Sequence, residues 1–367
     1  MRYSIPLSYN PINVPRLTEV LNRYQGVHHN QLITDFESAM CSVTGSSFAV
    51  ALNSGTAAIH LALKVLGIGA GDYVLAPTFT YVATINPIRY LGANPVLIDS
   101  EQITWNMDPN LVEAAILRLN AEGKKPKAMV VVHTYGMPCQ LDRLLEIAKQ
   151  EKLYLIEDAA ESLGSTYKGK MVGTFGDVGI YSFNNNKLVT TYGGGVMVTK
   201  NQELASKVRF WANQAREDLS YYEHREIGYN YAMSPLCAAA GISQMPDLQR
   251  NVDKRRSNFA SYNAALQPIG LLSQSELPGA YSNRWFSAFL FPDRATKQRV
   301  TAAMHAAGIE TRPLWRPMHQ QPIFQRVHVV SQGVAEDQFN RGICLPSGEL
   351  LTPEELETVL ALVKAEI

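Results

Sequence analysis

Residues 128–158 read AMVVVHTYGMPCQLDRLLEIAKQEKLYLIED and contain two β-rich runs separated by one helical pattern. The first run, 128–134, is apolar on both faces, which is typical of a strand inside a parallel sheet. The helical pattern over 141–152 is amphipathic, and the second β-rich run covers 153–158. This strand–helix–strand unit predicts a mostly parallel sheet that is covered by helices.

The same alternation extends along most of the first 200 residues. Further strands are expected at 47–52, 72–76, 95–100, 178–183 and 195–199, with helical patterns at 57–67, 81–92 and 111–123. The connection between the last two strands is too short for a crossover helix, so one of them is expected to lie antiparallel. The resulting sheet is therefore mixed.

The chain changes character after about residue 200. A helical, charged stretch over 201–265 leads into an α+β tail, which contains a strand pattern at 284–291, a helix at 297–308 and a strand at 309–314. The final helix begins at Thr352, and Glu355 completes a capping box there. We expect an α/β protein with a large domain over 1–250, including an N-terminal arm, and a small C-terminal α+β domain over 251–367.

Composition excludes several classes of protein. The 367 residues carry 33 basic and 33 acidic side chains, so the basic footprint of a nucleic-acid binder is missing. A hydrophobic content of 46% excludes disorder as the main state. No apolar run reaches transmembrane length, and the N-terminus lacks the apolar core of a signal peptide. We expect a cytoplasmic protein that binds a small molecule, with no nucleic-acid or membrane partner.

Neither a metal site nor a disulfide framework is expected. The four cysteines lie far apart in the sequence and form no CxxC motif. The eight histidines show no metal-binding spacing, and His28–His29 is interpreted as a polar loop pair.

Two glycine-containing motifs resemble nucleotide-binding loops only superficially. GSTYKGKM, residues 164–171, has Met171 where a P-loop needs Ser or Thr, and the residues after it cannot open a helix. GIGAGD, residues 67–72, has Asp72 in place of the last glycine of the dinucleotide fingerprint, and it precedes a strand. These motifs therefore predict neither ATP nor dinucleotide binding.

Three other features carry chemistry, although each has an ordinary structural interpretation. Asn53-Ser54-Gly55-Thr56 lies between a strand and a helix, where free N–H groups bind anions, but it also fits a plain N-cap turn. Asp158 ends a strand, where a carboxylate can pair with a pyridinium nitrogen or simply cap a helix. Lys187 lies among amides and apolar residues, where a lysine can form a Schiff base or remain a solvated loop residue.

The order of these features is more specific than any one of them. An anion turn, a strand-end aspartate and a lysine that follows Ser182 together supply a phosphate anchor, a partner for a ring nitrogen and an aldehyde trap. These are the groups that pyridoxal phosphate needs.

The chain resembles the DegT/DnrJ/StrS family of pyridoxal-phosphate sugar aminotransferases, which has the aspartate-aminotransferase fold (fold type I). The resemblance covers nearly the full length. It rests on NSGTAAIHLAL (53–63), APTFTYVATINPIRYLGANPVLIDS (76–100), IEDAAESLGS (156–165), YSFNNNKLVTTYGGG (181–195), IGYNYAMSPLCAA (227–239), TRPLWRPMHQQP (311–322) and CLPSGELLTPEE (344–355).

The resemblance implies a role for each matching residue. Lys187 binds the cofactor covalently and moves a proton between substrate and cofactor, and Asp158 pairs with the pyridine nitrogen. Gly55, Thr56 and Ser182 hold the phosphate.

The remaining assignments are also implied by the resemblance. Tyr81 stacks on the pyridine ring, and Glu161 lies near the ring oxygen or the substrate. Asn230 reaches the phosphate of the partner subunit, which implies a homodimer with shared active sites. Arg312 and His319 border the sugar-nucleotide pocket.

One position departs from the pattern, and one supports the aminating branch of the family. Ala232 stands where the family commonly has arginine after GYNY, which puts the local phosphate network in doubt. Lys187 is present, whereas relatives with histidine there are dehydratases.

The implied reaction moves an amino group from an amino acid, with L-glutamate as the expected donor, to a nucleotide-linked 4-keto-6-deoxy sugar, for surface polysaccharide or glycan biosynthesis. The cofactor alternates between pyridoxal and pyridoxamine phosphate. The sequence looks most like enzymes that aminate UDP-4-keto-6-deoxy-N-acetylhexosamines. Three alternatives remain: a GDP- or dTDP-keto-sugar aminotransferase, a cofactor-binding regulator without turnover, and a nicotinamide or flavin oxidoreductase.

Overall fold

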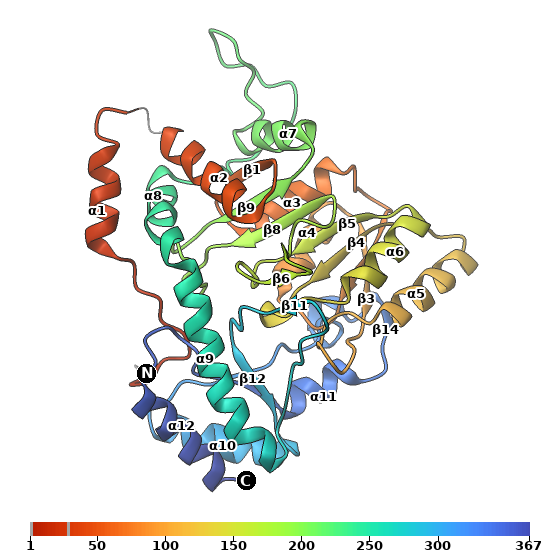
Figure 1. Ribbon diagram of the computed structural model, residues 1–367. Helices are drawn as coiled ribbons and strands as arrows, with labels where there is room; N and C mark the ends of the chain where they lie inside the picture. The colour runs from red at the N-terminus through yellow and green to blue at the C-terminus, as the bar shows by residue number, and fades with distance from the viewer. Residues whose placement is uncertain (1–2, 28–29) are drawn as a thin grey trace.

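The computed structural model describes residues 3–27 and 30–367, so the His28–His29 pair lies outside the described residues. Its centre is an eight-stranded sheet with the order β1-β9-β8-β5-β4-β2-β3-β14 (Figure 1). The strands are β1 (Phe48–Leu52), β2 (Tyr73–Pro77), β3 (Asn94–Ile98), β4 (Pro126–Val132), β5 (Tyr154–Asp158), β8 (Val178–Ser182), β9 (Gly195–Thr199) and β14 (His328–Val330).

The strand directions confirm the mixed sheet. β9 runs antiparallel to both β8 and β1, whereas the other neighbouring pairs are parallel. All strands except β9 therefore point the same way, and their carboxyl ends meet at one edge of the sheet. In open α/β sheets this edge is where ligands bind.

Helices cover both faces of the large sheet. Successive residues of β1 point to opposite sides, so that Ala49 and Ala51 join one apolar core while Val50 and Leu52 join the other. The first core includes residues of α2 (Asn30–Thr44), α5 (Pro109–Ala121), α6 (Leu141–Glu151) and α8 (Pro235–Gln244), and the second includes residues of α3 (Gly55–Val65), α4 (Asn86–Tyr90) and α7 (Gln202–Ala212).

The C-terminal part of the chain builds a second, antiparallel sheet with its own apolar core (Figure 1). Its order is β10 (Leu272–Ser273), β12 (Ser287–Leu290), β15 (Gly342–Leu345) and β13 (Arg312–Pro313), and it packs with α9 (Leu248–Leu266), α10 (Arg294–Ala306) and α12 (Pro353–Ala365). The capping box of Thr352 and Glu355 is present at the start of α12. Since β14 joins the large sheet from this part of the chain, the domain boundary at 250 stays a prediction.

The remaining elements are short or peripheral. They are α1 (Val14–Arg23), α11 (Val334–Arg341), β6 (Thr166–Tyr167), β7 (Lys170–Met171), β11 (Ala280–Tyr281) and the 3-10 turns η1 (Val82–Thr84), η2 (Thr134–Gly136), η3 (Met245–Asp247), η4 (Gln267–Ile269), η5 (Met318–Gln320) and η6 (Pro322–Phe324). The GSTYKGKM motif forms the β6–β7 hairpin rather than the start of a helix. The described residues include no helix that is both long and apolar enough to cross a membrane.

Asp99 ties α11 to the edge of the large sheet. Its buried carboxylate accepts hydrogen bonds from the N–H groups of Ser100, Gln332, Val334 and Ala335 and from the Ser331 hydroxyl. Burial acts to raise the pKa of Asp99, but these hydrogen bonds outweigh burial and lower it.

Asp99→Asn should therefore lower the free energy of unfolding at pH 7 by about 2–3 kcal/mol, because an amide cannot accept on both sides. A carboxylate with a lowered pKa in the folded state stabilises the fold above its unfolded pKa, and this contribution is lost as pH falls through the folded pKa. The stability difference between the two proteins should shrink in acid. Urea unfolding at several pH values measures it. Asp337→Asn, at an exposed position of α11, is the control, and an equal loss there would contradict this role.

Candidate active site

The turn between β1 and α3 presents free N–H groups at the carboxyl edge of the sheet. Ser54 caps α3 by accepting from the Ala57 N–H at 3.1 Å. Within the described residues, the N–H groups of Gly55 and Thr56 donate to no protein acceptor. Together with the positive end of the helix, they form a site for an anion.

Ser182 lies against this turn because two glycines allow close packing. A Cβ atom on Gly55 would lie 3.4 Å from Ser182 Cβ, and one on Gly195 would lie 2.4 Å from the Ser54 backbone. The Ser182 hydroxyl is thereby placed beside the free N–H groups at the end of β8. The structure thus brings Gly55, Thr56 and Ser182 together as one cradle of donors.

Asp158 ends β5 and is buried. Its Oδ2 accepts from the Thr84 hydroxyl at 2.7 Å, and its Oδ1 accepts from the Ala160 N–H at 3.2 Å. Burial raises the pKa of Asp158, while these two hydrogen bonds and the charge of Lys187 oppose that rise. A buried carboxylate of this kind gains most from a positively charged partner.

Lys187 extends from the loop that follows β8. Its Nζ lies 3.6 Å from the centroid of the Trp285 ring, a cation–π contact. Burial lowers the pKa of Lys187 to about 8, although the negative charges of Glu161 and Asp158 oppose this shift. A larger share of this amine is therefore neutral and nucleophilic near neutral pH than in an exposed lysine.

Glu161 is the second buried carboxylate near this lysine. Its Oε2 accepts from the Tyr135 N–H at 2.6 Å, and Tyr135 has the left-handed backbone angle φ 55°. Burial raises the pKa of Glu161 to about 7, against the opposing effect of Lys187. Glu161 therefore changes charge near neutral pH, a range in which an exposed glutamate is fully ionised.

A wall of four aromatic side chains connects Tyr81 to Lys187. Trp315 lies 5.4 Å from Tyr81 and 5.7 Å from Tyr135, between ring centroids, and Tyr135 lies 6.3 Å from Trp285. Tyr81 is 54% exposed, so its ring is free to stack on a planar ligand.

The other predicted residues lie around this centre rather than in it. Asn230 is exposed, and its carbonyl accepts from Asn53 Nδ2 at 3.2 Å, beside the anion turn. Ala232 forms an antiparallel bridge with Leu52. Arg312 is exposed and donates to Glu310 at 2.8 Å.

His319 is held by protein groups on both sides of its ring. Nδ1 lies 2.7 Å from the Thr78 hydroxyl, and Nε2 lies 2.8 Å from a carboxylate oxygen of Glu336. This geometry suits a residue that positions the end of β2, and it leaves neither ring nitrogen free for a substrate.

Sequence reasoning missed three residues of this site. Trp285 contacts Lys187 from the segment just before β12, the Tyr135 N–H donates to Glu161, and the Thr84 hydroxyl donates to Asp158. Trp285 and Tyr135 read as ordinary core aromatics, and only the position of Thr84 shortly after Tyr81 could have drawn attention to it.

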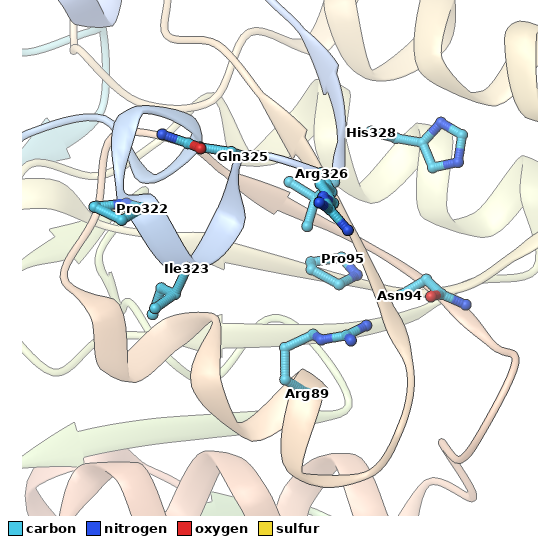
Figure 2. A pocket seen from close by; sticks show the side chains of 9 residues that line it. Arg89, Asn94, Pro95, Pro322, Ile323, Gln325, Arg326 and His328 are labelled. Atoms are coloured by element: carbon cyan, nitrogen blue, oxygen red, sulfur yellow. The ribbon is translucent and has the colours of Figure 1, made fainter.

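A separate hollow lies at the opposite, amino-terminal end of β3. It measures about 620 Å³ and is lined by Arg89, Asn94, Pro95, Pro322, Ile323, Gln325, Arg326, Val327 and His328. Figure 2 shows Arg89, Asn94 and Arg326 around Pro95. Asn94 and Pro95 begin β3, whereas the groups described above lie at the carboxyl ends of the strands, so this hollow is distinct from the candidate active site.

An anion turn, a buried carboxylate and a nucleophilic amine at one edge of an α/β sheet are typical of enzymes that act on carbonyl compounds through a lysine. The chain belongs to the DegT/DnrJ/EryC1/StrS aminotransferase family, whose model matches residues 12–364. It is therefore an aminotransferase, as the sequence resemblance implied.

Individual relatives match over nearly the whole chain. The putative pyridoxal phosphate-dependent aminotransferase EpsN of Bacillus subtilis (strain 168) is 43% identical over 90% of this chain and 86% of its own. GDP-perosamine synthase of Escherichia coli O157:H7 is 35% identical over 95% and 96%. A solved DegT DnrJ EryC1 StrS aminotransferase from Brucella abortus superposes with a TM-score of 0.90 at 28% identity, covering 96% of this chain and 95% of that one. The aspartate-aminotransferase-like fold is thereby confirmed.

Proposed function

We propose that pyridoxal phosphate binds at the carboxyl edge of the large sheet, with Lys187 as its covalent anchor. The observation that best supports this proposal is that a cradle of hydrogen-bond donors, the buried carboxylate of Asp158 and the amine of Lys187, whose pKa is lowered, lie together at this edge. Gly55, Thr56 and Ser182 would hold the phosphate. Within the family, the relative EpsN is named as pyridoxal phosphate-dependent. When bound, the cofactor supplies an aldehyde and an electron sink.

Four side chains around the cofactor site have separate proposed roles in the reaction. Lys187 Nζ accepts a proton from the amino donor and returns one to the keto carbon of the acceptor, which a pKa near the working pH favours. Asp158 stabilises positive charge on the ring nitrogen, Tyr81 stacks on the ring, and Glu161 lies beside Lys187 near the ring oxygen or the substrate. The hydrogen bonds from Thr84 to Asp158 and from the Tyr135 N–H to Glu161 fix the orientation of these two carboxylates.

The proposed substrates are L-glutamate and a nucleotide-linked 4-keto-6-deoxy sugar. Membership of the family supports a sugar acceptor. The sequence resemblance favours UDP-linked 4-keto-6-deoxy-N-acetylhexosamines, whereas the relative named GDP-perosamine synthase favours a GDP-linked sugar. We propose that Arg312 binds the substrate, because its guanidinium is exposed, and that His319 positions the pocket wall.

A panel of acceptors tests this proposal. The enzyme, loaded with pyridoxal phosphate, is incubated with L-glutamate and UDP-, GDP- or dTDP-linked 4-keto-6-deoxy sugars. Formation of an amino sugar by mass spectrometry, with an equal amount of 2-oxoglutarate, is the expected result and identifies the nucleotide. A protein that binds cofactor but turns over no donor or acceptor would favour the non-catalytic alternative.

We infer a homodimer in which Asn230 approaches the phosphate site of the partner subunit. The loop over 214–228 stands away from the body of the molecule (Figure 1). Its exposed apolar side chains are Leu219, Tyr221, Tyr222 and Ile227, and Tyr222 is 80% exposed. Such a projection is expected to be covered by a second protein surface. Analytical ultracentrifugation should give twice the mass of the chain, and a monomer at micromolar concentration would contradict the shared site.

The rate at which the apoenzyme captures pyridoxal phosphate should depend on Lys187 and Glu161. Capture needs the neutral amine, so the rate should rise with pH and level off above a midpoint near the lysine pKa of about 8. Because the Glu161 charge raises the pKa of Lys187, Glu161→Gln should move the midpoint to lower pH. Borohydride trapping across pH measures the rate. Glu113→Gln, on the surface beside Arg143, is the control, and an upward shift in Glu161→Gln would refute the coupling.

A further inference from the structure

The loop that carries Lys187 is held by side chains from distant parts of the chain. Asn10 Nδ2 donates to the Lys187 carbonyl at 2.9 Å and to the Leu188 carbonyl at 2.6 Å. Asn251 Nδ2 also donates to the Leu188 carbonyl at 2.9 Å. The preceding carbonyl, that of Asn186, accepts from the Ser8 hydroxyl at 3.3 Å and from the Trp285 indole at 2.8 Å.

Three consecutive carbonyls are thus satisfied from outside the loop. The segment lies between β8 and β9 and has no regular secondary structure. Its carbonyls therefore have no helix or sheet hydrogen bonds and need other donors. Within the described residues, Asn10 alone donates to the carbonyl of Lys187 itself. Its side chain is nearly buried, with 8% of Asn10 exposed.

The N-terminal arm that carries Asn10 is itself fixed on the second sheet and its loops. The Leu7 N–H donates to Glu310 at 2.9 Å, and the Leu7 carbonyl accepts from the Ser347 N–H at 2.8 Å. The Ser8 hydroxyl accepts from the buried Arg255 at 2.9 Å. The arm therefore forms a strap from the C-terminal part of the chain to the lysine loop.

We propose that Asn10 is a positioning residue for Lys187 and that the arm over 4–10 is the strap that holds the lysine in reach of the cofactor aldehyde. The lysine side chain is long and flexible, so the place where its Nζ arrives depends on where its backbone is fixed. Asn10 fixes that backbone by holding the carbonyls of two consecutive peptide bonds, Lys187–Leu188 and Leu188–Val189. This inference rests on the proposed binding of pyridoxal phosphate.

The strap acts on the lysine and not on the anion cradle. Asn10 donates to the carbonyls of residues 187 and 188, whereas the cradle consists of Gly55, Thr56 and Ser182, which Asn10 does not contact by any hydrogen bond in the described part of the chain. Covalent capture of the aldehyde and binding of the phosphate should therefore separate when Asn10 is changed.

The test compares two probes on apoenzyme with Asn10 intact or replaced by alanine. Pyridoxal phosphate reports covalent capture, through absorbance and borohydride trapping at Lys187. Pyridoxamine phosphate has no aldehyde and reports binding in the cradle, through calorimetry. Asn10→Ala should slow capture about tenfold or more, because a small displacement of a reacting group is enough for such a loss. Its dissociation constant for pyridoxamine phosphate should stay within about twofold of the wild type, since the cradle is untouched.

Asn13→Ala is the matched control. Asn13 lies three residues beyond the strap, and its side chain caps α1 by accepting from the Arg16 N–H. It should lower the thermal midpoint without slowing capture. Should Asn10→Ala fail to fold, Asn10→Ser, whose shorter hydroxyl can donate only one hydrogen bond, should give an intermediate rate.

Each outcome is decisive. If the Asn10 variant lost capture of pyridoxal phosphate and binding of pyridoxamine phosphate to the same extent, Asn10 would have a general folding role and the proposal would be overturned. Unchanged capture would overturn it as well. If the wild-type protein itself fails to capture pyridoxal phosphate, the proposed function fails, and this outcome is distinct from failure of the strap.

Discussion

Lys187→Ala should reduce amination by about 10⁴-fold or more, because the variant loses both the covalent anchor and the group that moves the proton. The fold should survive, since among the described residues the Lys187 ammonium forms no ion pair, and it contacts the face of Trp285. The backbone carbonyl of residue 187 would still accept from Asn10. Single-turnover kinetics with L-glutamate and the best acceptor of the panel measures this loss, and circular dichroism checks the fold.

The matched control for this prediction is Lys200→Ala. Lys200 is exposed, donates to the Thr174 carbonyl and follows β9, whose last residue lies at the edge of the sheet opposite the candidate site. Its removal should leave turnover within twofold of the wild type, as surface substitutions usually do. Amination by Lys187→Ala at the wild-type rate would refute the assigned role of the lysine.

Asp158→Asn should give the second largest loss, about 10²–10³-fold, because a neutral amide cannot stabilise positive charge on the cofactor ring. The substitution keeps the shape of the side chain, and an amide oxygen can still accept from the Thr84 hydroxyl. The variant should therefore still bind the cofactor through the cradle and the lysine. Its signature is a loss of turnover with cofactor retained.

Asp142→Asn provides the comparison for Asp158. Asp142 is exposed and pairs with Lys168 on the surface, so its change should leave turnover unaltered. If Asp158→Asn retained full turnover, or if it lost activity only because cofactor dissociated, the pairing with the ring nitrogen would be wrong.

The large sheet could be predicted from local patterns because each strand repeats the same apolar signal. The expected strands at 47–52, 72–76 and 153–158 agree with β1, β2 and β5 to within one residue at each end. The antiparallel arrangement of β8 and β9 followed from the short connection between them. The predicted helix at 81–92 proved to be η1 and α4, with Pro87 near the start of α4.

Long-range pairings could not be predicted in the same way. β14 has three residues and joins the far edge of the large sheet, and the expected strand at 309–314 shrinks to Arg312–Pro313. Such short pairings are decided by tertiary packing and not by the local sequence. For the same reason the contact of the N-terminal arm with the lysine loop, across 177 residues, carried no sequence signal.

The residues of the candidate site also fall into those that local sequence patterns predict and those that tertiary packing brings in. Asp158 ends β5, Gly55 begins α3 shortly after β1, and Lys187 lies in the loop after β8, so their convergence at one sheet edge follows from topology once the strand directions are known. Trp285 and Asn10 enter from other parts of the chain, and only the folded structure places them at Lys187. The pKa values of Lys187 and Glu161 depend on that enclosure, and therefore no sequence pattern could give them.

The absorbance spectrum of the purified protein, recorded before and after addition of L-glutamate, tests the central claim most directly. We predict a visible band from pyridoxal phosphate bound to Lys187, and its replacement by the shorter-wavelength absorbance of pyridoxamine phosphate when glutamate is added. The absence of a visible band after the cofactor has been supplied would contradict the assignment of the site.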